Sequence, residues 1–585
     1  MVHRVSDIES DDDAILARFQ PIVRFTEGEF FLPMGIDDYL QQCRLWSHQQ
    51  RRSRSCVADV GELDRDRLVA LTAGRSATWS LQYATDPMSR SEVVAWRLDG
   101  DRPRFSGASR LGSVGVLGRM IDAVMRLTLL ARGRVASGTE ARAEVQYRPH
   151  RRNNEHTCYT RCFRQDGYLV LQYWFFYAFN DWRSRAHGVN DHEADWEQVT
   201  IFCAERDGDV TPKWVVYSAH DEQGDDLRRR WDDPDITRVG DQVVVFAGLG
   251  SHSGAYLAGD YLVTFDRDSL GHLYTLGRRI SRTLLPWTRD EERNAVGAPY
   301  IDYARGDGEV VGEGSRTWRR ERIDDDTSWV VDYEGLWGHD TEDPFGGERG
   351  PAGPRYERGG IVRRSWANPV AWAGLDKVPP DDDAASEVIE RRRLELEPLL
   401  DAERERHDQL IDLLRATAAA GADVESMQAE VTDQAATVEA LTEERRRLAV
   451  AATTERTAAG PHDHLRHRHT PMEPATTVRR RVLSAWSAVS TPLLLLTLAM
   501  LVLPLGPSIA TFAVISLTVI FAIEALARRR LVSFLLTAVL VVIGVSISVS
   551  IVIGLLVEWR YTVAMLLAAG ALVVLVLNLA ELRRR

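Results

Sequence analysis

Two runs of aromatic and β-branched residues in the first half of the chain predict adjacent buried strands. Residues 169–177 read LVLQYWFFY and residues 196–203 read WEQVTIFC, a composition typical of strands covered by other parts of a protein. A polar stretch separates the two runs. Because side chains two residues apart on a strand point to the same face, we expect Asp195 and Glu197 to point the same way from the start of the second strand.

The polar stretch predicts a divalent-cation site. Two carboxylates on one face repel each other unless a proton or a cation lies between them. Carboxylate oxygens together with one imidazole suit a hard or borderline ion such as Mg²⁺, Ca²⁺, Mn²⁺ or Zn²⁺. The residues that we predict as ligands are Asp181, His192, Asp195 and Glu197. The alternative is a strand connection whose polar groups form ordinary hydrogen bonds and salt bridges with neighbouring arginines.

Four long apolar runs near the carboxyl end predict membrane spans. They cover about residues 486–504, 507–526, 531–556 and 561–580. Each has the roughly 17 to 25 residues that cross the hydrocarbon core of a bilayer. They carry almost no ionisable residue apart from Glu524 near a helix end, whereas transporters and channels usually hold polar groups at mid-membrane. The runs therefore favour an anchor or an oligomerising bundle over a transport path.

Arginines around these runs predict their orientation. Clusters at 479–481, 528–530 and 583–585 lie before the first run, between the second and third, and after the last. The loop between the third and fourth runs has only Arg560. Basic residues are enriched on the cytoplasmic side, so we expect both termini and the large amino-terminal part in the cytoplasm. The arginine- and alanine-rich composition favours a bacterial source, and hence a bacterial plasma membrane. The acidic start of the chain predicts no signal peptide.

A charged, alanine-rich segment at 381–457 predicts helices between the amino-terminal part and the membrane. Acidic residues at 381–383 can cap its start, Pro398 would kink the first helix, and Gly421 marks a break. Apolar residues after the break follow a heptad seam, which predicts a helical hairpin or a coiled coil that could also pair two copies of the chain. The seam consists of Val424, Met427, Val431, Val438, Leu441 and Leu448.

Composition narrows the class of protein. The formal net charge of −13 argues against a general nucleic-acid binder. Five cysteines are few and odd in number, which predicts reduced thiols rather than a disulfide framework. A linker at 458–481 is rich in histidine and arginine; we interpret it as a solvated juxtamembrane segment, although such tracts can bind metal. Its histidines are His462, His464, His467 and His469.

The residues His192, Asp195, Trp196 and Glu197 resemble the core of two related families. One is the family of vacuolar protein sorting-associated protein 62, and the other, more distant, is that of the necrosis- and ethylene-inducing-peptide-like cytolysins. Both carry a His-x-x-Asp-Trp-Glu core after an aromatic strand. The cytolysins hold a divalent cation with the matching residues and an upstream Asp, which implies the same role for Asp181.

The resemblance extends over roughly residues 15–378. The segments VVYSAHDE (215–222) and VVVFAGLGSHSGAY (243–256) look like two His-bearing strand ends of the first family. Ala194 stands where the cytolysins have a second His, so the resemblance does not imply toxin activity. It implies a β-sandwich-like domain without a settled biochemical activity.

His220, Ser251 and His252 are candidate ligand-binding residues. Each histidine follows a β-rich run and precedes small or acidic residues, so each is expected where a strand enters a loop. Together they could line a pocket beside the cation loop, or they could cap turns and satisfy buried backbone groups. Ser251 is not at the centre of a nucleophile elbow, because that position of the motif holds His252.

The expected architecture has several parts. An acidic, disordered start at 1–14 precedes an all-β, sandwich-like domain at 15–378, followed by the helical segment at 381–457, the linker at 458–481 and four transmembrane helices at 482–582.

We expect a membrane-anchored cytoplasmic binding or interaction protein, whose ligand is a sugar, a lipid headgroup or a protein. The alternatives are a metal-dependent hydrolase, with Asp195 or Glu197 as ligand or base and His252 as proton donor, and a pore or structural membrane assembly. The hydrolase lacks a recognisable nucleophile or complete catalytic motif in the sequence, so an enzyme is the less favoured interpretation.

Overall fold

The chain divides into two compact units. The structure, a computed structural model, groups residues 1–105, 134–261 and 302–471 into unit 1 and residues 106–133, 262–301 and 472–585 into unit 2. The expected domain at 15–378 is therefore interrupted by two segments that group with the carboxyl-terminal helices. The residues that the structure describes are 11–49, 53–74, 78–100, 105, 112, 114–131, 137–182, 191–218, 224–265, 275–277, 279, 283, 285–288, 298–339, 350–453, 460–465, 468–472, 478–503, 506–557 and 559–582.

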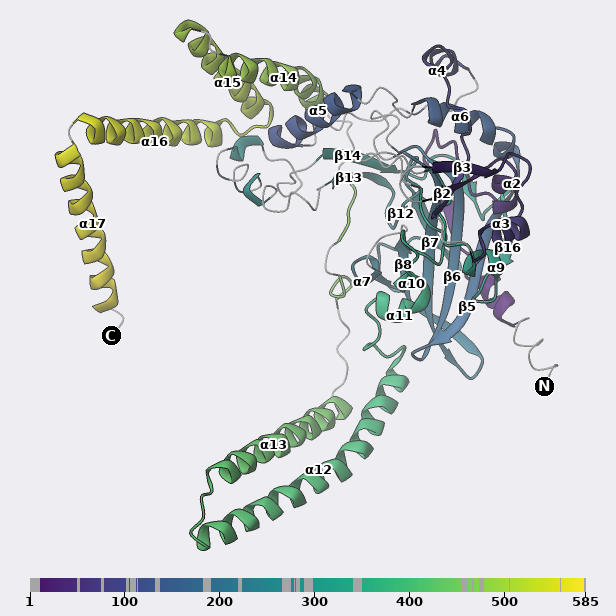
Figure 1. Ribbon diagram of the computed structural model, residues 1–585, viewed down its shortest axis with the longest axis vertical. Coiled ribbons are helices and arrows are strands. Elements are labelled where there is room, and N and C mark those ends of the chain that lie inside the picture. The colour runs from purple at the N-terminus through teal and green to yellow at the C-terminus, as the bar shows by residue number, and fades with distance from the viewer. Residues whose placement is uncertain are drawn as a thin grey trace. The chain divides into compact units, whose positions relative to one another are not determined.

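A six-stranded sheet forms the centre of unit 1 (Figure 1). Its strand order is β16-β5-β6-β7-β8-β9, and all neighbours are antiparallel except the parallel pair β16 and β5. Every residue of β6 is buried, which explains its nearly continuous apolar sequence. The strands are β5 (Glu155–Gln165), β6 (Tyr168–Asn180), β7 (His192–Arg206), β8 (Asp209–Ser218), β9 (Arg229–Arg230) and β16 (Thr317–Arg322).

A second sheet covers one face of the central sheet. Its order is β10-β11-β1-β15, with β12 paired to β11. Tyr173 and Val199 of the central sheet share an apolar core with Val23 and Val245 of the second sheet. This pair of packed sheets is the sandwich-like part of the fold. The strands are β1 (Ile22–Arg24), β10 (Arg238–Val239), β11 (Gln242–Ala247), β12 (Gly254–Ala255) and β15 (Val310–Val311).

The other face of the central sheet is covered by aromatic side chains, short helices and a three-stranded sheet. Phe176 and Trp196 point into a core that also contains Trp337 and Trp366, and the rings of Trp196 and Trp337 lie 5.5 Å apart. Because both faces are buried, β6 and β7 show little alternation of apolar and polar residues. The three-stranded sheet is formed by β2 (Arg44–Gln49), β3 (Ser53–Ala58) and β4 (Thr78–Gln82).

Unit 1 is β-rich rather than all-β, because helices lie between its strands. Their apolar side chains add to the core around the three-stranded sheet, where Leu68 and Tyr147 are fully buried. The helices are α2 (Ile36–Leu40), α3 (Arg65–Thr72), α4 (Arg90–Arg97), α6 (Ser137–Tyr147), α7 (Gly224–Leu227), α9 (Ser328–Val331), α10 (Arg364–Ala367) and α11 (Pro369–Trp372), with the 3-10 helix η2 (His150–Arg152).

The segment predicted as helical forms an antiparallel hairpin of α12 (Asp382–Ala419) and α13 (Glu425–Thr453) (Figure 1). Pro398 lies within α12, which continues through it as one helix. Gly421 has a φ of 73° and ends the helix in the left-handed conformation that glycine adopts without strain. The heptad seam is half-buried, and Arg392 of α12 pairs with Glu444 of α13, so the two helices contact each other within one chain.

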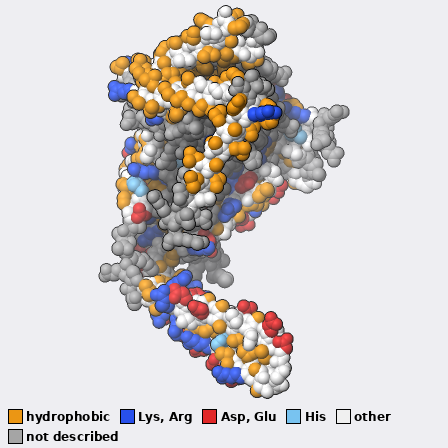
Figure 2. Space-filling view, turned by 90° about the vertical axis from the view of Figure 1, so that its left-hand side faces the viewer, with side chains coloured by type: hydrophobic (Ala, Val, Ile, Leu, Met, Phe, Trp, Pro, Cys, Tyr) orange, Lys and Arg blue, Asp and Glu red, His pale blue; other side chains and the backbone are white. Residues whose placement is uncertain are grey.

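Unit 2 is largely helical, and its described residues include three helices long and apolar enough to cross a membrane. The apolar segments are Arg481–Val502, Pro507–Ala527 and Leu531–Ile553. In the fourth predicted span, the described apolar run is the shorter Trp559–Leu575. Figure 2 shows apolar side chains on these helices and charged side chains on the hairpin. The elements are α5 (Val116–Ala131), α14 (Val478–Val502), α15 (Pro507–Ala527), α16 (Leu531–Val557), α17 (Trp559–Leu582), η5 (Pro286–Thr288) and the paired strands β13 (Gly259–Phe265) and β14 (Ala298–Ala304), which link both units in sequence.

Glu524, the ionisable residue of the second span, is held in a buried ion-pair network within unit 2. Its Oε1 lies 2.9 Å from Nη2 of Arg119 and 2.7 Å from Nε of Arg528. Arg119 belongs to α5 and also donates to the Ser490 hydroxyl on α14. The ion pairs fix α5 to the helical hairpin formed by α14 and α15, because moving α5 away from this hairpin would leave buried charges unpaired.

Candidate functional site

The predicted ligands His192, Asp195 and Glu197 lie inside strand β7 and not in the loop before it. Asp195 is opposite Tyr177 of β6, and Glu197 is opposite Phe175. Tyr177 and Phe175 belong to the core between the two packed sheets, so the two carboxylates share that face of the strand, as the alternation predicted. All three side chains are buried. The candidate site is therefore an interior cluster at the start of β7.

Ala194 breaks the regular alternation of β7 by adopting a φ of 60°. The preceding side chain, Glu193, consequently reaches the opposite face of the sheet from Asp195. Its carboxylate accepts hydrogen bonds from the backbone N–H groups of Tyr83, Ala84 and His339 at 2.8, 2.8 and 3.0 Å. Burial raises the pKa of Glu193, and these hydrogen bonds oppose that rise.

His252 is held between two buried carboxylates. Its Nδ1 lies 2.9 Å from Oδ2 of Asp195, and its Nε2 lies 3.6 Å from Oε1 of Glu29. The imidazole stacks on the ring of Tyr177, with centroids 3.8 Å apart and planes at 4°. The side chain of His252 is 0% exposed, and those of the two acids are 0% and 1% exposed. The arrangement brings together residues from three distant parts of the sequence.

We call His252, Asp195 and Glu29 the His252 trio. The opposite charges within this trio stabilise one another. Burial alone would lower the pKa of His252, but the carboxylates of Glu29 and Asp195 outweigh it and raise this pKa to about 10. Burial raises the pKa of Glu29, yet His252 and the backbone N–H groups of Gly250 and Phe31 bring it below the usual value. The raised pKa of His252 and the lowered pKa of Glu29 favour an imidazolium paired with a carboxylate at neutral pH. A sealed cation of this kind is poorly suited to exchange a proton with an external substrate.

Glycine at position 250 allows the loop that carries His252 to approach Asp181. Gly250 has a φ of 75°, and a Cβ there would overlap Oδ1 of Asp181. Its N–H donates to Oε2 of Glu29 at 2.7 Å, and its carbonyl accepts from the N–H of Asp181 at 3.1 Å. One loop thus connects the carboxylate that was predicted as a cation ligand with the His252 trio.

Asp181 is grouped with carboxylates that the sequence analysis did not identify. Donor atoms of Asp181, Glu140 and Glu144 all lie within 4.8 Å of one another, and the three residues are buried. Glu140 and Glu144 are one turn apart on α6, and Glu144 also accepts a hydrogen bond from Nε1 of Trp96 at 3.0 Å. Three carboxylates form an all-oxygen donor set, which is typical of Ca²⁺ or Mg²⁺ sites. Within the described residues, Asp181 does not form such a group with His192, Asp195 and Glu197.

The other predicted site residues have different surroundings. His192 turns back on its own strand, with Nδ1 2.7 Å from the carbonyl of Ala194. Ser251 donates to Oδ1 of Asp302 at 2.8 Å and is almost fully buried. His220 lies outside the described residues. Ser251 and His252 are therefore interior residues whose side chains pair with carboxylates.

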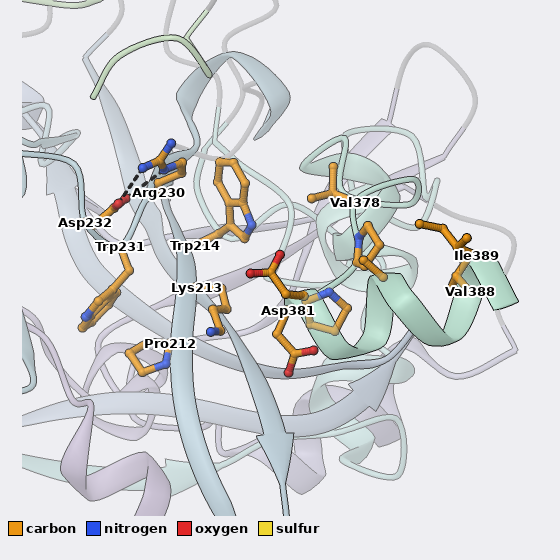
Figure 3. A pocket seen from close by; sticks show the side chains of 14 residues that line it. Pro212, Lys213, Trp214, Arg230, Trp231, Asp232, Val378, Asp381, Val388 and Ile389 are labelled. Atoms are coloured by element: carbon orange, nitrogen blue, oxygen red, sulfur yellow. Dashed lines mark hydrogen bonds and ion pairs between the residues drawn. The ribbon is translucent and has the colours of Figure 1, made fainter. Parts of the chain in front are cut away.

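An open cleft lies elsewhere in unit 1, between β8, the residues around β9 and the start of α12 (Figure 3). We call it the β8–α12 cleft; residues 212–214, 230–232 and 378–382 contribute most of its lining, and its volume is about 740 Å³. Trp214 and Trp231 are half-buried on one side of it. Charged groups flank the aromatic rings. They include Lys213, Asp381 and the Arg230–Asp232 ion pair.

Sequence reasoning missed Glu29, Glu140 and Glu144 because each is remote in sequence from the Asp-Trp-Glu core. A weak signal was present for Glu140 and Glu144, whose spacing of four places them on one face of a helix. Glu29 precedes two apolar residues, Phe30 and Phe31. Its carboxylate accepts hydrogen bonds from the backbone N–H groups of both. No spacing rule connects Glu29 with His252.

Comparisons with family models, with curated proteins and with solved structures found no match for this chain. The resemblance based on the His-x-x-Asp-Trp-Glu core therefore stays a prediction.

Proposed function

We propose that the protein is a membrane-anchored binding protein that takes its ligand in the β8–α12 cleft. The observation that carries this proposal is the contrast between two places in unit 1. The histidine and carboxylates of the His252 trio are sealed from solvent, whereas the cleft is open and offers two half-buried tryptophans. Aromatic rings beside a few charged groups are typical of a surface that binds and orients a ligand without transforming it.

The lining of the cleft favours a sugar among the three ligand classes expected from the sequence. A sugar ring has an apolar face that can lie against Trp214 or Trp231, and hydroxyl groups at its edge that can bond to charged side chains. Lys213 and Asp381 provide one donor and one acceptor at the rim. A cleft of about 740 Å³ has room for a short oligosaccharide.

An array of immobilised oligosaccharides, probed with the full-length protein in detergent, tests this proposal. We expect binding to a subset of sugars that weakens about fivefold or more in Trp231→Ala or Trp214→Ala, because stacking contributes on the order of 1 kcal/mol or more. Trp46→Ala is the matched control, since Trp46 is a half-buried tryptophan of the three-stranded sheet, away from the cleft lining. Equal binding by Trp231→Ala, Trp214→Ala and the unaltered protein would rule out the cleft as the binding site.

We also propose that a divalent cation binds at Asp181 together with Glu140 and Glu144. The support is the mutual proximity of three buried carboxylates, since a hard cation such as Ca²⁺ or Mg²⁺ offsets their repulsion. Calcium titration of chelator-treated full-length protein should show one site that Glu144→Gln weakens and Glu193→Gln does not. Calcium binding that is unchanged in Glu144→Gln would overturn this assignment.

For the membrane part, we propose four spans with both termini in the cytoplasm. The arginine clusters support this topology, together with three helices of spanning length and a fourth apolar helix. Single cysteines placed after residue 582 and at the exposed position of Cys56 should both be protected from an impermeant thiol reagent in intact cells. Labelling of only one of the two positions would indicate an odd number of spans.

A further inference from the structure

Part of the histidine-rich linker is docked on unit 1 and is not solvated as expected. Nε2 of His464 lies 3.2 Å from Oδ2 of Asp233, and Nδ1 of His462 lies 3.5 Å from Oδ1 of the same carboxylate. The side chain of Asp233 is fully buried and that of His464 is 6% exposed. The His464 ring also contacts Trp214 edge-on, at 5.6 Å between centroids. The contacts join residues more than two hundred positions apart in the sequence.

The donor atoms in this cluster match a transition-metal site. Asp233, Asp235 and His462 each place a ligand atom within 4.8 Å of the others, and His464 adds a second imidazole. Two imidazoles with carboxylates suit Zn²⁺ or another borderline ion better than Ca²⁺ or Mg²⁺. Tetrahedral Zn²⁺ with bonds of roughly 2.0–2.1 Å holds its ligand atoms about 3.3 Å apart. The separations of 3.2 and 3.5 Å between histidine nitrogens and Asp233 oxygens are close to that value.

The hydrogen bonding of Asp233 points independently to a cation beside its carboxylate. Oδ2 of Asp233 is buried and accepts no hydrogen bond, and the nearest guanidinium nitrogen, Nε of Arg229, is 3.7 Å away. Nε2 of His464 is 3.2 Å from the backbone N–H of Arg230 and equally far from this oxygen. Nε2 of His464 has one lone pair, so it binds either the N–H of Arg230 or a cation beside Asp233. A cation at Oδ2 of Asp233 satisfies a buried carboxylate oxygen that accepts no hydrogen bond.

Arg229 forms a buried ion pair with Asp233 at 3.7 Å, whereas Arg468 and Arg230 are paired with other carboxylates. Arg468 forms a bidentate ion pair with Asp235, at 2.7 and 2.8 Å, and so attaches the linker at a second point. Arg230 is paired in the same way with Asp232, at 2.5 and 2.8 Å. The charges of Arg468 and Arg230 are thus neutralised by other carboxylates.

We propose that Asp233, His462 and His464 bind a divalent transition-metal ion, best fitted by Zn²⁺, with the carboxylate of Asp235 beside them. The ion clamps the linker, which precedes the membrane helices in the sequence, onto the β-rich unit. This site is separate from the carboxylate cluster at Asp181, and it takes ions of a different class.

Zinc and cobalt binding to the full-length protein test this proposal. After treatment with a chelator and dialysis, the protein should bind Zn²⁺ with a site that His464→Gln and Asp233→Asn each weaken at least about tenfold. Co²⁺ in this site should show the intense visible absorption of a tetrahedral complex. His407→Gln is the matched control, because His407 lies beside Asp408 on α12 with a similar separation of 3.7 Å and should leave binding unchanged.

A second measurement covers the case in which a variant alters the fold. Zn²⁺ should slow tryptic cleavage between residues 454 and 477 in the unaltered protein and in Glu144→Gln, which removes a carboxylate of the other cluster. The same protection should be lost in His464→Gln. The proposal is overturned if the unaltered protein binds no Zn²⁺, or if His464→Gln and Asp233→Asn both retain the site.

Discussion

Replacing His252 with glutamine should destabilise unit 1 in a way that depends on pH. The substitution removes the cation from between Glu29 and Asp195, which are 1% and 0% exposed. Losing one partner of a buried ion pair costs about 3–5 kcal/mol. The rise of the His252 pKa from the usual 6.5 to about 10 gives a similar magnitude, roughly 4–5 kcal/mol at about 1.4 kcal/mol per pKa unit.

The sign of the pH dependence follows from the raised pKa of His252. The folded protein holds this proton more tightly than the unfolded chain does, so the contribution is complete below pH 6.5 and is lost as pH rises towards 10. Glu29 has a lowered pKa, so its contribution to the free energy of unfolding is present at neutral pH and is lost as the pH falls into the acid range. The two shifts describe one ion pair, so their free energies do not add. Between pH 7 and pH 9 the difference in stability between the protein and His252→Gln should shrink by about 1.4 kcal/mol per pH unit.

Thiol labelling during urea unfolding measures this difference in the full-length protein. All five cysteines belong to unit 1, and all except Cys56 are buried, so their labelling reports the unfolding of that unit. Cys56 should react at once and serves as an internal standard. His407→Gln controls for removal of a histidine from the hairpin. A stability difference that stays constant from pH 7 to pH 9 would refute the assignment of an imidazolium at His252.

Three further perturbations test the rest of the structure. Glu193→Ala should lower the stability of unit 1 by about 3 kcal/mol, because three backbone N–H groups lose a buried acceptor, and Glu193→Gln should recover part of the loss in the same urea assay. Arg119→Leu should destabilise unit 2 by about 3 kcal/mol by removing a buried partner of Glu524, seen as a lower melting temperature of the helical circular dichroism in detergent. Arg392→Ala should leave the unfolding midpoint unchanged, because its ion pair with Glu444 is exposed.

Local patterns predicted the longest strands and helices, but they missed the shorter helices of unit 1 and the partners of each element. The apolar runs of the carboxyl-terminal part predicted helices of membrane-spanning length, and the structure confirms three. The aromatic run at 169–177 predicted β6, although the second strand begins four residues earlier than expected, at His192. Strand length was misjudged because polar residues at 192–195 looked like a loop, whereas the interior of this unit accommodates them with buried hydrogen bonds and ion pairs.

The sequence predicted the positions of some residues of the candidate site, but not the residues that contact them. Periodicity correctly placed Asp195 and Glu197 on one face, since that depends only on strand geometry. The cation group that includes Asp195 stays a prediction, and in the structure Asp195 is paired with His252, which periodicity did not predict.

By itself, the sequence of this protein determined properties that depend on neighbouring residues: the strands β6 and β7, the helical hairpin, and the segments apolar enough for a bilayer. The tertiary structure alone decided which charged groups meet. Glu29 with His252, Glu140 with Asp181, and Asp233 with His464 are separated by long stretches of chain. A side chain's periodic position specifies its direction from the backbone, but the packing of whole sheets and helices selects what lies opposite it.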